Sequence, residues 1–120
     1  MRTRVLQPRF YDVFDVIQLG DHIPWSGSVA IDHVHVPPGQ SSRVHRHEEA
    51  DTYLLILGGK GEVVIGDEAI AVSGAMLLHI APGVDHGVRT MSEALTFVSV
   101  QSPPILHPDG RLDLIPRAPQ

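Results

Sequence analysis

Three histidines at two places in the 120-residue chain have the residue type and spacing of metal ligands. His45 and His47 are two residues apart, and alternate residues of a β-strand point to the same face, so a strand here presents two imidazoles side by side. His86 follows the turn-forming pair Pro82-Gly83 and would bring a third imidazole from another part of the chain. Imidazoles without thiolates suit iron, zinc, nickel, manganese or copper. The sequence therefore predicts a site for one divalent transition metal, with open positions for a small-molecule substrate.

Two further histidines and a tyrosine are candidates for a role near the metal. His33 and His35 share one face of their strand: if that face looks inward, either is a partner or general base beside the metal, and otherwise both are exposed. Tyr53 either presents its hydroxyl to the pocket or packs as a strand aromatic. His79, in the apolar segment 75–80, is expected to be a hydrogen-bonded core residue. The catalytic residues stay unassigned, with His33, His35 and Tyr53 as candidates.

The composition excludes several other functions. With 42% hydrophobic residues, the 120-residue chain has enough apolar side chains for one domain with a buried core. The formal charge of −5 provides no basic surface for nucleic acid or for an anionic membrane. Cysteine is absent, which removes disulfides and thiolate ligands. No segment has the apolar length of a membrane span or of a signal peptide, and we expect a cytoplasmic protein.

The elements that must position the histidines are short β-strands separated by glycine and proline turns. The expectation is an all-β sandwich or barrel with little or no helix. A single domain 1–120 would have its barrel core at about 28–101, N-terminal strands within 1–27, and an extended proline-rich tail at 102–120. The expected strands lie at 28–36, 52–57, 61–65, 69–72, 75–80, 84–89 and 95–100, with one or two more within 5–19.

Two motifs resemble those of the cupin superfamily. Gly39, five intervening residues and His45-Arg46-His47, closed by Gly58 or Gly59, resemble its first motif. The segment Pro82-Gly83-Val84-Asp85-His86 resembles the centre of its second. The combination is similar to small single-domain metal-binding cupins of the cupin 2 type. The resemblance implies a double-stranded β-helix, a jelly-roll barrel, with His45, His47 and His86 as metal ligands.

The resemblance also implies a glutamate ligand after the histidine pair, and the chain has none at that position. The position falls on Asp51 if Gly58 closes the motif and on Thr52 if Gly59 does. Asp51 is therefore a candidate fourth ligand, and the alternative is a solvated carboxylate beside other acidic residues. Without it the site is a three-histidine one.

The function implied by the resemblance is that of a metal-dependent enzyme acting on a small organic substrate. A dioxygenase-like reaction with iron is favoured; the alternatives are a metal-dependent lyase, isomerase or decarboxylase, and a non-catalytic binding or sensing module. Small cupins commonly form homodimers by exchanging N-terminal strands, a role that would suit the apolar segment from Phe10 to Leu19. The expected pocket walls are Leu54, Ile56, Met76, Leu78 and Val88.

Overall fold

The computed structural model describes residues 9–18 and 28–117, so the predictions for 1–8, 19–27 and 118–120 lie outside the described residues. Ten strands and no helix are present in the described ranges, which confirms the all-β prediction. The strands are β1 Arg9–Tyr11, β2 Phe14–Gln18, β3 Ala30–Val36, β4 His45–Arg46, β5 Asp51–Ile65, β6 Glu68–Ser73, β7 Met76–Ile80, β8 His86–Arg89, β9 Leu95–Ser102 and β10 Ile115–Pro116.

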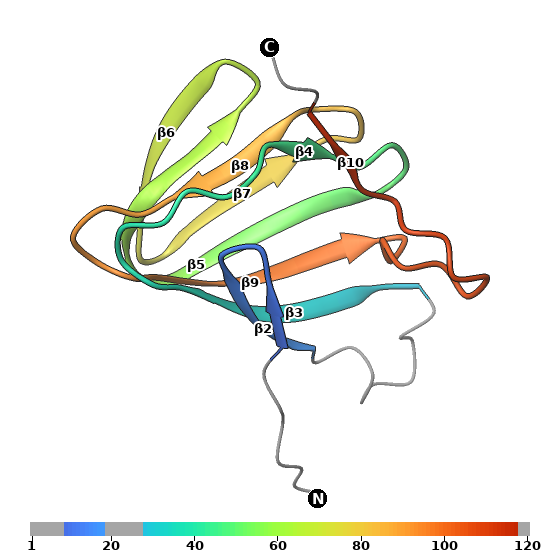
Figure 1. The fold of residues 1–120 in the computed structure, drawn as a ribbon, viewed down its shortest axis with the longest axis horizontal. Helices are drawn as coiled ribbons and strands as arrows, with labels where there is room; N and C mark the ends of the chain where they lie inside the picture. Colours follow the sequence, from blue (N-terminus) through green and yellow to red (C-terminus); the bar gives the residue numbers. More distant parts are fainter. Residues whose placement is uncertain (1–8, 19–27, 118–120) are drawn as a thin grey trace, which may run out of the picture.

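The strands form an antiparallel sheet that curls into a jelly-roll barrel open on one side (Figure 1). One part of the sheet runs β1-β2-β3-β9-β5, with β7 on the other edge of β5. The distal half of β5 turns into the second part, where it pairs with β6 and β8, and β8 pairs in turn with β4. The long strand β5 therefore joins both walls of the barrel.

The two strands predicted at 52–57 and 61–65 are a single strand, which corrects the sequence-based division at Gly58-Gly59-Lys60. The chain stays paired with β9 through a register shift between Ile56 and Gly58. Gly59 has a φ of +83°, and a Cβ at this position would lie 1.8 Å from the carbonyl oxygen of Ala94. Glycine therefore lets the strand bend against its neighbour instead of turning away from it.

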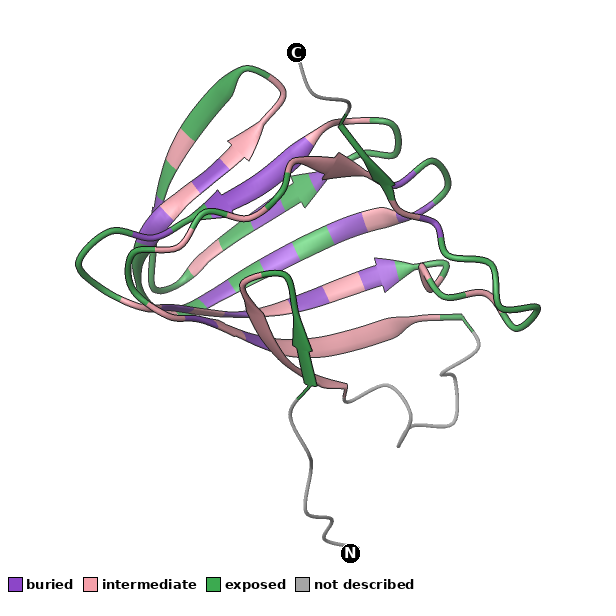
Figure 2. Cartoon of the chain, in the orientation of Figure 1, coloured by how far each residue is buried: buried purple, intermediate pink, exposed green. Residues whose placement is uncertain are grey.

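The core lies between the two walls and follows the alternation of the strands. In β5, Thr52, Leu54 and Ile56 are buried while the residues between them are exposed, which gives the banding in Figure 2. The most completely buried large side chains are Ile56, Ile80, Leu95, Val36 and Val63.

The proline-rich tail contains no helix as far as residue 117, where its description ends, and this part folds back across the mouth of the barrel (Figure 1). β10 pairs with β4, so that Pro116 lies opposite His45 and Ile115 opposite Arg46. Asp113, just before this strand, is buried. At the other end of the chain, the β1–β2 hairpin pairs with β3 of the same chain.

Candidate metal centre

The three histidines predicted as ligands meet at the mouth of the barrel. His45 on β4 is the register partner of His86 on β8, and His47 follows two residues after His45. One ring nitrogen of each lies within 4.8 Å of the others, and the ring centroids are 4.5 to 5.1 Å apart. His47 and His86 are buried, and His45 is partly exposed. The strand pairing therefore forms the cluster from two segments 39 residues apart, from His47 to His86.

Each of the three rings is oriented by a backbone carbonyl. Nδ1 of His47 lies 2.6 Å from the carbonyl oxygen of Asp113, and Nδ1 of His86 lies 3.0 Å from that of Val84. Nδ1 of His45 makes a longer contact of 3.3 Å with the carbonyl of Arg43. A carbonyl can only accept, so each ring donates from Nδ1 and, when neutral, has its free lone pair on Nε2. This is how proteins orient metal-binding histidines.

Burial favours the neutral form of two of these imidazoles, His86 and His45. It lowers the pKa of His86 to about 4; the Val84 carbonyl opposes this shift, and the neighbouring His45 and His47 add to it. The pKa of His45 is also lowered, first by burial and then by the proximity of His47. The neutral ring is the form that binds a metal, and a cluster of three imidazoles with adjacent nitrogens suits a borderline divalent cation.

Asp113 connects the tail to the histidine segment, and the sequence analysis missed it. Its carboxylate accepts hydrogen bonds from the backbone N–H groups of Glu48, Glu49 and Ala50 at 2.7, 3.0 and 3.1 Å. Burial raises the pKa of Asp113, but these backbone donors outweigh it, so the net pKa is lowered. The backbone carbonyl of Asp113 also accepts a hydrogen bond from Nδ1 of His47. Asp113 therefore holds both the loop that follows His47 and the His47 ring.

Asp51 does not join the three histidines. Its Oδ1 lies 2.8 Å from Nε2 of His79, and both side chains are about half exposed on the outer face. Thr52 is on the inner face, 2% exposed, and lines the pocket. Successive strand residues point to opposite faces, so only one of this pair can face the histidine cluster. The structure places Thr52 there and leaves Asp51 at the surface, which favours the alternative of a solvated carboxylate.

The remaining candidates also lie on the outer face. Tyr53 is exposed and stacks on His79 with ring centroids 4.7 Å apart, so His79 is not the core residue that its apolar segment predicts. His33 and His35 alternate with Asp32 and Val34, which line the pocket, and Nδ1 of His35 contacts Thr96 at 3.1 Å. The structure therefore brings none of His33, His35 and Tyr53 to the three-histidine cluster.

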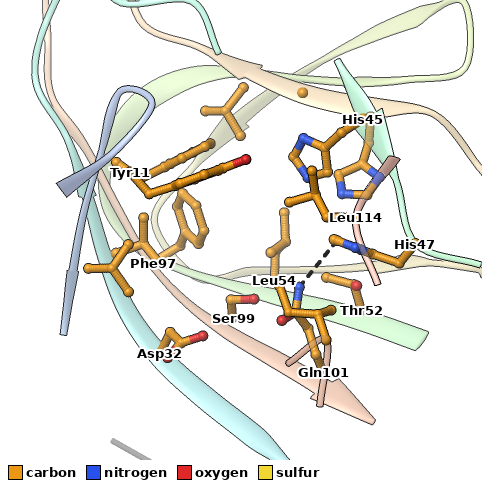
Figure 3. A pocket seen from close by; sticks show the side chains of 17 residues that line it. Tyr11, Asp32, His45, His47, Thr52, Leu54, Phe97, Ser99, Gln101 and Leu114 are labelled. Atoms are coloured by element: carbon orange, nitrogen blue, oxygen red, sulfur yellow. Dashed lines mark hydrogen bonds between the residues drawn. The ribbon is translucent and has the colours of Figure 1, made fainter. Parts of the chain in front are cut away.

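A pocket of about 130 Å³ opens directly onto the three rings (Figure 3). Of the predicted walls, Leu54 and Val88 line it, whereas Ile56, Leu78 and Met76 belong to the core or pack against it. The apolar lining is completed by residues from the hairpin, β3, β9 and the tail: Tyr11, Phe14, Val16, Val34, Phe97, Ile105 and Leu114.

The polar part of the pocket comes from the β3, β5 and β9 strands. Asp32, Thr52, Ser99 and Gln101 point into it (Figure 3). The amide nitrogen of Gln101 lies 3.3 Å from Nε2 of His47. The alternation of β3 puts Asp32 on the face opposite His33 and His35, whereas no local pattern marks Ser99 or Gln101 as pocket residues.

A family model described as Cupin domain matches residues 32–101, more than half of the chain. The chain belongs to the cupin family. The match spans both histidine motifs and the strands that carry the polar part of the pocket. No curated protein matches this cupin. Within the described ranges, no helix is long and apolar enough to cross a membrane.

Solved structures similar to this cupin share the fold at low sequence identity. The polyketide cyclase RemF from Streptomyces resistomycificus superposes with a TM-score of 0.79 at 18% identity, covering 100% of this chain and 88% of that one. Streptomyces Pac13, a nucleoside dehydratase, gives 0.72 at 14% identity, covering 93% and 84%. A predicted oxalate decarboxylase from Thermotoga maritima gives 0.74 at 18% identity, covering 85% and 98%. At these identities the comparisons support the fold alone.

Proposed function

We propose that this cupin is a divalent-metal-dependent enzyme acting on a small organic substrate, with an iron-dependent, dioxygenase-like reaction as the leading candidate. The observation that carries the proposal is the cluster of three histidines at one pocket, each with its Nδ1 on a backbone carbonyl, which leaves Nε2 for a metal. A metal held there would polarise substrate oxygens or activate molecular oxygen. The named relatives include a cyclase, a dehydratase and a predicted decarboxylase, and therefore do not choose the reaction.

The residues around the histidines would bind the substrate and exclude water from the pocket. Tyr11 of the hairpin and Leu114 of the tail cover opposite sides of the pocket mouth, and Phe97 and Leu54 form an apolar wall between them (Figure 3). Such a wall suits a substrate with a flat or partly apolar body.

The test begins with the metal content of protein purified without chelators or a nickel column. About one metal per chain is expected, and the His47→Ala variant should lose it. The iron-loaded protein is then assayed for oxygen uptake with catechols, diketones, thiols and 2-oxo acids. His79→Ala, on the outer face, is the matched histidine control and should retain the metal and the activity. Absence of bound metal in the wild type would refute the proposal.

A second candidate is a lyase, isomerase or decarboxylase that does not consume oxygen. It is favoured by Asp32 and Ser99, which line the same pocket and are groups able to accept or relay a proton. Turnover under anaerobic conditions with zinc, nickel or manganese, lost in Asp32→Asn, would establish it over the dioxygenase. Saturable binding of the same compounds without turnover would indicate the binding or sensing module instead.

We also propose that the protein is a homodimer. The support is apolar surface on the outer face of β5 and β7, where Tyr53, Leu55, Leu57 and Leu77 are between 42% and 67% exposed. Light scattering at micromolar concentration should give twice the chain mass, and Leu55→Glu combined with Leu77→Glu should halve it. A wild-type monomer would contradict this proposal and leave the metal site untouched.

A further inference from the structure

The side chain of Gln101 reaches the histidine cluster from β9, although neither histidine motif includes it. It is 7% exposed, and its amide nitrogen lies 3.3 Å from Nε2 of His47 (Figure 3, dashed line). The nitrogen and oxygen of a glutamine amide have nearly the same size, and a half-turn of the amide exchanges them. Either an N–H or a carbonyl oxygen can therefore face the cluster.

The register of β5 and β9 explains why a glutamine reaches this place. Thr52 and Gln101 are direct partners across the two strands, so their side chains project from the same face. Thr52 occupies the inner-face position where the first motif calls for a glutamate, but its side chain is short. Its Oγ1 is buried and has no hydrogen-bond partner among the described residues. The longer side chain of Gln101 on β9 reaches into the space that the short side chain of Thr52 leaves on β5.

A cation at the three histidines would exclude the arrangement in which the amide N–H faces His47. The lone pair on Nε2 of His47 would then point at the cation and could not accept a hydrogen bond. With the amide turned by half a turn, Oε1 faces the cation. The NH₂ group is then free to donate to Oγ1 of Thr52, the cross-strand neighbour that lacks a partner.

We propose that Oε1 of Gln101 is the fourth protein ligand, taking the place of the carboxylate that Asp51 keeps on the outer face. The inference rests on the proposed binding of a metal by His45, His47 and His86. Three imidazoles and one amide carry no charge, so the ligands themselves leave the 2+ charge of the cation uncompensated, and the carboxylate of the pocket, Asp32, is not among them. Such a site favours a substrate that binds as an anion, through a carboxylate, phenolate or enolate oxygen.

The experiment is a titration of the metal-free protein with cobalt(II), which reports both affinity and, through its visible absorption bands, the ligand set. Gln101→Leu should weaken binding by roughly 10- to 100-fold, the range seen when supporting groups of metal sites are lost, and should alter the bands. Gln101→Glu should bind at least as tightly as the wild type because a carboxylate oxygen takes the amide oxygen's place. Gln40→Leu makes the same change in a loop outside the pocket and should match the wild type.

If Gln101 acted as an N–H donor instead, the glutamate variant would lose its advantage in metal affinity over the leucine variant. A carboxylate cannot donate, so Gln101→Glu would then bind no better than Gln101→Leu, and that result would overturn the inference. Equal affinities and unchanged bands in all variants would overturn it as well. The glutamate variant preserves side-chain size, so the comparison with wild type decides the matter even if the leucine variant fails to fold. Failure of the wild type to bind cobalt(II) would instead refute the proposed function.

Discussion

Nδ1 of His47 donates to the carbonyl oxygen of Asp113 across 2.6 Å, and the carboxylate of the same aspartate binds the three backbone N–H groups that follow His47. The two residues are 66 positions apart. The C-terminal tail is thus a structural part of the candidate metal centre, because it sets both the path of the loop after His47 and the orientation of the His47 ring.

Replacing Asp113 with asparagine should destabilise the protein by about 1–3 kcal/mol, since an amide NH₂ would then face a buried backbone donor. Urea denaturation of the metal-free protein measures this loss. Asp109→Asn is the matched control: Asp109 accepts one N–H in an exposed turn of the same tail, through an oxygen that asparagine retains. Its effect should stay within about 0.5 kcal/mol. Equal losses in the two variants would contradict the anchoring role.

Metal-free protein should lose stability as the pH falls from about 6.5 toward 4. The pKa of His86 is lowered from 6.5 to about 4 by burial, so between these values the unfolded chain binds more protons than the folded one. The loss of folding stability that His86 causes approaches about 3 kcal/mol at the acid end of this pH range. His86→Gln cannot gain the proton, so denaturation curves at pH 7, 5.5 and 4.5 should show its stability falling less steeply than that of the wild type. Parallel curves would show that His86 does not contribute.

Asp51→Asn should leave metal affinity within about twofold of the wild type, because the Asp51 carboxylate is on the outer face with His79. His47→Ala, which removes a ring from the cluster, should weaken binding by roughly 100-fold or more. Competition with a chromogenic chelator measures both. A large loss of affinity in Asp51→Asn would mean that the strand presents its other face to the metal in solution.

Gly59→Ala should destabilise the protein by about 3 kcal/mol or more, because the φ of +83° disfavours any side chain and the new Cβ would overlap the Ala94 carbonyl. Gly58→Ala is the neighbouring control: a Cβ there meets nothing within 4 Å, and the cost should be about 1 kcal/mol or less. Thermal and urea denaturation of the two variants make the comparison. A similar cost at both positions would argue against the bend at Gly59.

The sequence by itself was enough for the fold class and for the three histidines. Both depend on short-range patterns, since His45 and His47 are two residues apart on one extended segment and His86 follows a Pro-Gly turn. Strand alternation also separates Asp32 from His33. These features are readable because neighbouring residues alone determine them.

The tertiary structure decided which side chains complete the site. Whether Asp51 or Thr52 faces inward depends on how β5 pairs with β7 and β9, and a shift of one residue would exchange them. The contacts of His47 with Asp113 and Gln101 join residues more than 50 positions apart, and no local pattern marks such partners. The course of a loop-rich tail and the register of a long bent strand are set by the packing of the whole barrel.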